Sequence, residues 1–218
     1  MFENASDKLN DARIALERLQ SLVTQPVVSN IQIISGPQRS AGDAEGTLNP
    51  VAYAEAFSSC LAQIRAIGDA IIKNKNANTL PGFGSWRDSK KTECQNDSLL
   101  RFINEARNAD LHEGRCPLLF TMHPFSFESD RVGPAPSTNA VLVIDGRGPQ
   151  WIIDRGTPNE RRSPVEPNGI IYYTVAISNP PVIHLQNPLS STTPTAILHQ
   201  AESYYSRLLY EARSTFAP

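Results

Sequence analysis

An arginine, an asparagine and a histidine lie close together where a helix is expected to end, and together they could act on a phosphate ester. Arg107, Asn108 and His112 belong to the stretch Phe102–Gly114. A guanidinium binds phosphate through two parallel hydrogen bonds, and an imidazole exchanges protons near neutral pH. Arg107 and His112 are five residues apart, so a regular helix leaves them about 140° apart. A local break near the helix end could bring them together.

Motifs for other chemistries are absent from the sequence. There is no Cys-x-x-Cys pair, and His112-Glu113 lacks the second histidine of a His-Glu-x-x-His zinc motif. Neither a phosphate-binding Gly-x-x-x-x-Gly-Lys loop nor a Gly-x-Ser-x-Gly nucleophile elbow occurs. We therefore expect no metal and no cofactor. The histidines are scattered along the chain: His112, His123, His184 and His199.

The segment Arg107-Asn108-Ala109-Asp110-Leu111-His112 resembles the Arg-x(4–6)-His signature of HEPN domains, in which a polar residue commonly follows the arginine. The preceding Leu99–Ala106 is similar to the amphipathic helix that leads into that signature. The helix pattern around it extends the resemblance to a helical bundle. Residues 117–190 carry no motif that belongs to it.

The resemblance implies a bundle that dimerises and places two Arg/His motifs in one cleft. Many HEPN proteins are metal-independent endoribonucleases of toxin–antitoxin, antiphage or CRISPR-linked systems. His112 would then activate the ribose 2′-hydroxyl or protonate the leaving oxygen, and Arg107 would bind the scissile phosphate. Asn108 would position the RNA or orient His112. The expected product carries a 2′,3′-cyclic phosphate.

Structural roles for the same residues stay open. Arg107 could pair with Glu105, Asp110 or a carboxylate on another helix, and the helix dipole alone favours a histidine at the position of His112. An acidic partner for His112 could come from another helix, where Glu55 and Asp69 are candidates.

Weaker candidates for binding the substrate are Asp110 and a basic cluster near the expected hairpins. The cluster comprises Arg155, Arg161 and Arg162, which could equally be solvated loop residues.

Proline divides the chain. Of the 17 prolines, 12 fall between Pro117 and Pro194, and proline is costly inside helices. We expect an α+β fold, a HEPN-like helical bundle with a small antiparallel β insertion before the C-terminal helix. The predicted divisions are a bundle at 1–116, a β-rich insertion at 117–190 and a helix at 191–218 that completes the bundle. Alternatively, the last helix covers the sheet in a separate α+β unit.

Apolar spacing and capping residues predict the individual elements. Ser6 is expected to cap a helix that runs to Val23, and Asn49-Pro50 opens another that runs to Lys73. The motif helix starts near Asp97 and ends before Gly114, while Pro81–Gly84 breaks the pattern. The expected strands and the last helix are strand-like content at 27–34, a hairpin of 140–145 and 151–154, strands at 170–177 and 182–185, and a helix from Thr193-Pro194.

Charge rules out a polybasic nucleic-acid binder. Lys plus Arg is 20 and Asp plus Glu is 22, a net charge of −2. Residues 92–218 contain ten arginines and no lysine, so any contact with RNA is local and uses arginine. No apolar run approaches a membrane span, and no secretory signal is visible at the N-terminus. The separated Cys60, Cys94 and Cys116 predict reduced thiols and a cytoplasmic protein.

The leading hypothesis is a HEPN-type endoribonuclease that cleaves single-stranded RNA, works as a homodimer in antiphage defence or a toxin–antitoxin system, and has an antitoxin or defence-complex protein as a further partner. A second hypothesis is a non-catalytic HEPN-like scaffold that binds a protein partner or a small ligand through its β insertion. A third is an interaction module in which the motif match is accidental.

Overall fold

The computed structural model describes residues 2–24, 43–47, 49–123, 140–145, 148–164 and 172–216. The chain forms two compact units, one of Met1–Met122 with Tyr173–Pro218 and one of His123–Tyr172. Among the described residues, no helix combines the length and apolar character needed to cross a membrane.

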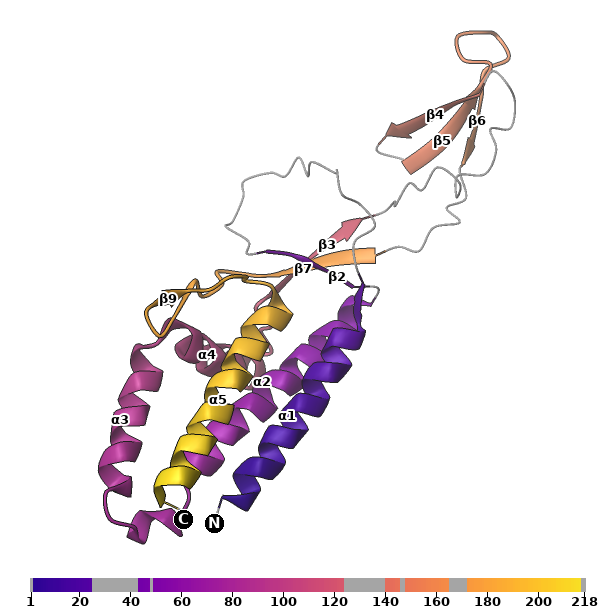
Figure 1. Ribbon diagram of the computed structural model, residues 1–218. Helices are drawn as coiled ribbons and strands as arrows, with labels where there is room; N and C mark the ends of the chain where they lie inside the picture. Colours follow the sequence, from indigo (N-terminus) through magenta and orange to yellow (C-terminus); the bar gives the residue numbers. More distant parts are fainter. Residues whose placement is uncertain are drawn as a thin grey trace. The chain divides into compact units, whose positions relative to one another are not determined.

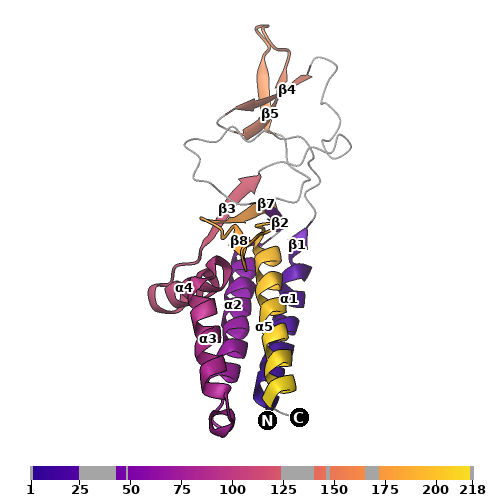
Figure 2. The ribbon, with the colours of Figure 1, turned by 60° about the vertical axis from the view of Figure 1, so that its left-hand side comes forward.

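Three long helices form the frame of the first unit: α1 (Glu3–Ser21), α2 (Pro50–Ile72) and α5 (Pro194–Phe216). Each of the three packs against the other two (Figure 1). The start of α1 and the end of α5 lie at the same end of the bundle (Figure 2). Each helix buries one apolar face, the usual reason that amphipathic helices associate. The largest fully buried side chains of these helices include Leu19, Tyr53, Phe57, Leu61, Ile64, Ile67, Ile71 and Tyr205.

Two shorter helices complete the bundle after a 3-10 turn at Ala77–Thr79. They are α3 (Phe83–Asn96) and α4 (Ser98–Glu113), and α4 packs against α2, α3 and α5. The sequence pattern does not predict helix α3, because Pro81–Gly84 breaks the apolar spacing. Gly82 has a φ of 80° and α3 begins directly after it.

The reason for this error is the composition of α3. It buries only Phe83 and Cys94, so its apolar pattern is weak. The packing of two aromatic side chains holds it in place: the ring of Phe216 lies 5.3 Å from that of Phe83 and 5.5 Å from that of Trp86. Those contacts join residues more than a hundred positions apart, which local spacing cannot reveal.

A four-stranded sheet closes one end of the first unit. Its order is β1 (Val23–Thr24), β2 (Glu45–Thr47), β7 (Tyr172–Ile177) and β3 (Leu118–His123). Strand β2 is antiparallel to β7, with Glu45 opposite Val175. The predicted insertion of residues 117–190 is therefore divided: β3 and β7 join the sheet of the bundle, and the second unit spans only His123–Tyr172.

The second unit contains an antiparallel meander. Strands β4 (Ala140–Asp145), β5 (Gly148–Ile153) and β6 (Arg161–Pro164) pair in that order. The predicted hairpin is present, although β5 begins at Gly148 rather than at Trp151. After β5, Asp154 and Gly156 both have positive φ, which turns the chain toward β6.

A small hairpin of β8 (Ile183–His184) and β9 (Asn187–Pro188) precedes α5 in the first unit. The expected strand at 182–185 is thus shorter than predicted. The strand-like segment at 27–34 lies outside the described residues.

The expected α+β class is confirmed, as are two helix ends. Asn49 Oδ1 accepts a hydrogen bond from Ala52 N at 3.0 Å with Pro50 as the first helical residue, and α4 ends at left-handed Gly114. The predicted cap at Ser6 is wrong. Helix α1 begins at Glu3, and the Ser6 hydroxyl donates to the Phe2 carbonyl from inside the helix.

Candidate active site

The motif lies on the second half of α4, which is one uninterrupted helix. Asp97 caps it by accepting from Leu100 N at 2.9 Å, and Gly114 at φ 62° ends it, with Arg115 N donating to Ala109 O. The buried face comprises Leu99, Leu100, Ile103 and Ala106.

No break separates Arg107 from His112, because α4 extends from Ser98 to Glu113 as one helix. Five residues of regular helix turn the chain by about 500°, so the two side chains leave the helix about 140° apart. A single copy of α4 therefore does not bring Arg107 and His112 onto one face.

Arg107 is half-buried and has no carboxylate partner among the described residues. Its Nη1 donates to Asn108 Oδ1 at 3.3 Å, and its Nε is shielded from solvent without an acceptor in the described part of the chain. Glu105 instead lies 3.8 Å from Arg101. Among the described residues, Arg107 forms no ion pair with Glu105 or Asp110, so the structure does not support this alternative.

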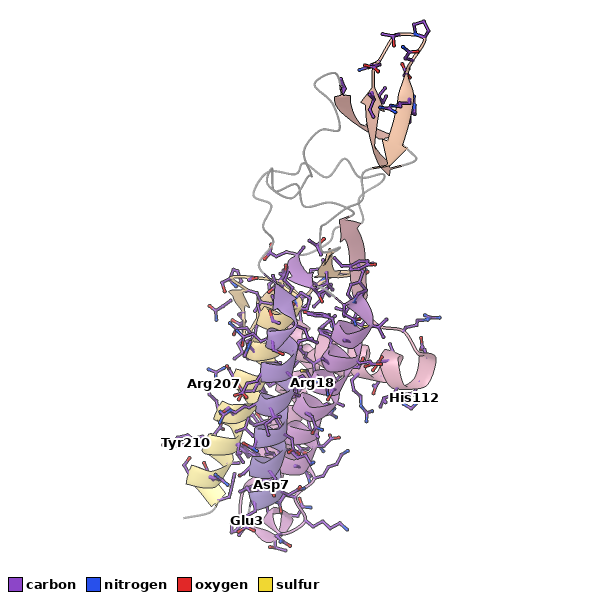
Figure 3. The ribbon with its side chains drawn as sticks, turned by 90° about the vertical axis from the view of Figure 1, so that its right-hand side faces the viewer. Glu3, Asp7, Arg18, His112, Arg207 and Tyr210 are labelled. Carbon is purple, nitrogen blue, oxygen red and sulfur yellow. The ribbon has the colours of Figure 1, made fainter. Side chains whose placement is uncertain are left out.

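His112 is exposed in the last turn of α4 (Figure 3). Neither of its candidate acidic partners contacts it. Asp69 pairs with Arg65 at 2.9 Å and with Lys73 at 3.2 Å, and Glu55 is exposed on α2.

The remaining motif positions differ in environment. Asn108 is exposed, and Asn104, one turn earlier, has a buried Oδ1 with no donor among the described residues. Asp110 is half-buried near the thiol of Cys116. Burial raises the pKa of Cys116, and the charge of Asp110 raises it further. The Asp110 carboxylate is therefore close enough to Cys116 to act on its thiol electrostatically.

The three candidate arginines of the basic cluster belong to the second unit. Arg155 is exposed in the turn after β5, whereas Arg161 and Arg162 are exposed on β6, opposite Ile153 and Ile152. Arg161 and Arg162 are thus strand residues rather than loop residues. These arginines belong to the second unit, whereas Arg107 and His112 belong to the first.

Sequence reasoning missed a buried pair beside the start of α4. Asp97 Oδ1 lies 3.0 Å from His184 Nδ1, and Asp97 Oδ2 accepts from Leu185 N at 2.6 Å. Burial raises the pKa of Asp97, but hydrogen bonds from Leu185 N, Leu100 N and His184 outweigh it and hold that pKa below its ordinary value. Helix periodicity carries no signal for this pair, because its members are 87 residues apart.

Next to this pair is a cavity of about 580 Å³ between α4 and the segment 179–186. Its apolar walls come from Phe102, Pro181, Val182 and Ile183, and its polar groups include Arg101 and Glu105 of α4. The cavity was not predicted, since its two walls are far apart in the sequence.

In the described ranges, no three His, Cys, Asp or Glu side chains cluster closely enough to hold a metal ion. Comparison with models of protein families, with curated proteins and with solved structures gives no match to this chain. The functional argument thus depends on the residues of the molecule itself.

Proposed function

We propose that this chain is a HEPN-type, metal-independent endoribonuclease that cleaves single-stranded RNA at the C-terminal end of α4. The observation that carries the proposal is the state of Arg107: a half-buried guanidinium without a carboxylate partner in the described residues. Such a cation has an unused capacity for an anion, and a phosphate matches the geometry of a guanidinium.

The chemistry needs only groups that the motif supplies. His112 takes the proton from the ribose 2′-hydroxyl, whose oxygen then attacks the adjacent phosphorus. The P–O5′ bond breaks, the leaving 5′-oxygen takes up a proton from water, and the other product ends in a 2′,3′-cyclic phosphate. Arg107 stabilises the charge on the phosphoryl oxygens, and Asn108 holds the RNA or the imidazole in place.

The angle between Arg107 and His112 supports a site completed by two copies of the chain. Groups about 140° apart on one helix do not reach a common phosphate from one side, whereas two helices related by a two-fold axis can each supply one of them. Leu111 lies between the two on α4 and is 55% exposed, so a contact between copies along this face would bury it. We infer a homodimer as the active form.

The setting we propose is cytoplasmic, in antiphage defence or a toxin–antitoxin system, with an antitoxin or defence-complex protein as partner. Asp110, Arg155, Arg161 and Arg162 remain secondary candidates for RNA contact.

The test is cleavage of a labelled single-stranded RNA in EDTA. Arg107→Ala and His112→Ala should each lower the rate by roughly a hundredfold or more, since a positioned acid or base contributes about that much. Matched controls are Arg18→Ala and His199→Ala, which replace exposed residues on α1 and α5 and should leave the rate unchanged. Equal rates for all four variants would exclude this mechanism.

A second candidate function is supported by the separate second unit. His123–Tyr172 is compact by itself, and a minimal nuclease does not require it. A non-catalytic scaffold would bind a protein partner or a small ligand through this unit. Deleting Ala140–Pro164 from the chain distinguishes the two: a scaffold loses its partner, while a nuclease retains RNA cleavage.

A further inference from the structure

The cavity beside α4 has walls held in a fixed shape. The Asp97 carboxylate accepts from Leu185 N, and the Ser98 hydroxyl donates to the Ile183 carbonyl, so the start of α4 is joined to the hairpin. Leu185 and Gln186 form the turn with φ of 47° and 66°, a conformation that non-glycine residues adopt at a cost. The contacts to α4 offset that cost and keep the wall in place.

The wall from the hairpin exposes apolar side chains toward the cavity. Val182 is 59% exposed and Ile183 is 46% exposed, although both line this space. Phe102 of α4 contributes an aromatic ring to the other wall. At about 580 Å³ the cavity lies in the size range of small-molecule sites, and its mixture of apolar faces and a few polar groups is typical of them.

The carboxylates of the cavity favour a flat ligand that donates hydrogen bonds. Glu93 and Glu105 supply carboxylate oxygens, Arg101 supplies a guanidinium, and Asn96, Asn179 and Gln186 supply amides that donate as well as accept. Carboxylates repel phosphate but accept from the exocyclic amino groups of adenine, cytosine and guanine. Uracil has no such amino group.

The cavity lies on the same side of α4 as His112. Arg101, Glu105, Asn108 and His112 fall within about 60° of one another around the helix at 100° per residue. Glu105 precedes His112 by seven residues, about 10 Å along the axis. An RNA strand that follows this stripe toward His112 passes the mouth of the cavity, and Arg101 there is 58% exposed.

We propose that this cavity binds an unstacked RNA base that carries an exocyclic amino group (adenine, cytosine or guanine, but not uracil), close to the phosphate that is cleaved. The inference rests on the proposed ribonuclease function and states which RNA bases the enzyme prefers next to the cleaved phosphate. Aromatic contact with an extruded base, together with hydrogen bonds to its edge, is the usual way proteins read single-stranded RNA.

The test measures binding of free adenosine, cytidine and uridine to the full chain by calorimetry, with NMR of the Val182 and Ile183 methyl groups as a second readout. Adenosine and cytidine should bind and shift these methyl signals, and uridine should bind roughly tenfold or more weakly. Uridine bound as tightly as adenosine, or methyl signals that do not move, overturns the proposal.

Two variants and a matched control localise the binding. Val182→Trp fills the cavity and should weaken adenosine binding at least tenfold, whereas Val51→Trp, at a 67% exposed site on α2 outside the cavity, should not. Glu105→Gln should narrow the difference between adenosine and uridine. If Val182→Trp fails to fold, the shifts of the Val182 and Ile183 methyl signals in the unaltered chain decide whether adenosine binds in the cavity.

The outcome is separable from that of the proposed function. If the chain cleaves RNA but binds no nucleoside, the base-binding proposal is wrong and the proposed ribonuclease function still holds. If Val182→Trp abolishes adenosine binding but the unaltered chain cleaves no RNA, the base-binding proposal holds and the proposed ribonuclease function is wrong.

Discussion

The carboxylate of Asp97 and the imidazole of His184 meet at 3.0 Å in the interior of the bundle. Asp97 also caps α4 through Leu100 N and holds the hairpin through Leu185 N. One side chain thus fixes both the start of the motif helix and one wall of the neighbouring cavity. His184 contributes its ring to the same region, where it packs edge-on against Tyr204.

Asp97→Asn should destabilise the chain by about 1–3 kcal/mol, because a hydrogen bond to a charged group is worth more than one to an amide. Asparagine is itself a good helix cap, so the loss reports mainly the contacts with His184 and Leu185. The measurement is urea unfolding at neutral pH. Asp7→Asn, at an exposed site on α1, is the control and should change stability by less than about 0.5 kcal/mol.

The acid response should also depend on Asp97. Its pKa in the folded chain lies below the ordinary 3.8, because its hydrogen bonds favour the charged form. The unfolded chain then binds this proton more tightly. The stabilisation is complete above pH 3.8 and is lost as pH falls through the lower folded pKa. Unfolding measured between pH 5 and about pH 2 should show a smaller loss for Asp97→Asn than for the unaltered chain.

The pH dependence of folding stability that Glu45 contributes should have the opposite sign to that of Asp97, and it should appear at higher pH. Burial raises its pKa above 4.5, although Thr195 donates to it and lowers it in part. The folded chain binds this proton more tightly, so protonation stabilises the fold, and that contribution is lost as pH rises through the folded pKa. Glu45→Gln should remove the dependence in the window just above pH 4.5. An unchanged pH profile in this variant would contradict the assignment.

A close approach between α2 and α5 predicts a glycine requirement. A Cβ on Gly68 would lie 2.6 Å from Cε1 of Tyr205, whose ring is fully buried. Overpacking costs about 1–3 kcal/mol, against a gain of about 1 kcal/mol in helix propensity. We expect Gly68→Ala to lower the unfolding free energy. Gly84→Ala on α3, where a Cβ meets nothing within 4 Å, should raise it by about 0.5–1 kcal/mol.

The sequence predicted those parts of the fold that depend on local signals. Asn49-Pro50 and Gly114 mark helix ends because capping and left-handed conformation restrict the residue type at one position. The wrong start at Ser6 has the same origin, since serine caps helices but also donates to a preceding carbonyl inside them.

Long-range contacts account for what could not be predicted. Helix α3 depends on Phe216, and the cavity depends on a hairpin held by Asp97 from elsewhere in the chain. The sequence shows the types of the motif residues, whereas only the structure shows that Arg107 has no carboxylate partner among the described residues. The regular course of α4 through His112 also decides that Arg107 is not on the same face.

The three thiols should differ in reactivity. Burial raises the pKa of Cys60 to about 12 and raises that of Cys94 as well, and both side chains are buried. Cys116 is only half-buried. Because the thiolate is the reactive form, iodoacetamide should label Cys116 first in the folded chain and the other two only on unfolding. Peptide mass spectrometry reads the order, and Asp110→Asn should speed the labelling of Cys116.

Mixing two inactive variants tests whether the active site is shared between copies. Arg107→Ala and His112→Ala, refolded together in equal amounts, form mixed dimers in half of the cases. If each site takes Arg107 from one copy and His112 from the other, one of the two sites in a mixed dimer is intact. Random pairing under two-fold symmetry therefore restores roughly a quarter of the original cleavage rate.

The matched control replaces His112→Ala with a variant that carries both substitutions. Mixed dimers with Arg107→Ala then contain no intact Arg107, so the rate should stay at the level of the single variants. If the first mixture recovers nothing although subunits exchange, both groups come from the same chain. The continuous helix between Arg107 and His112 argues against that outcome, since α4 directs the two side chains about 140° apart.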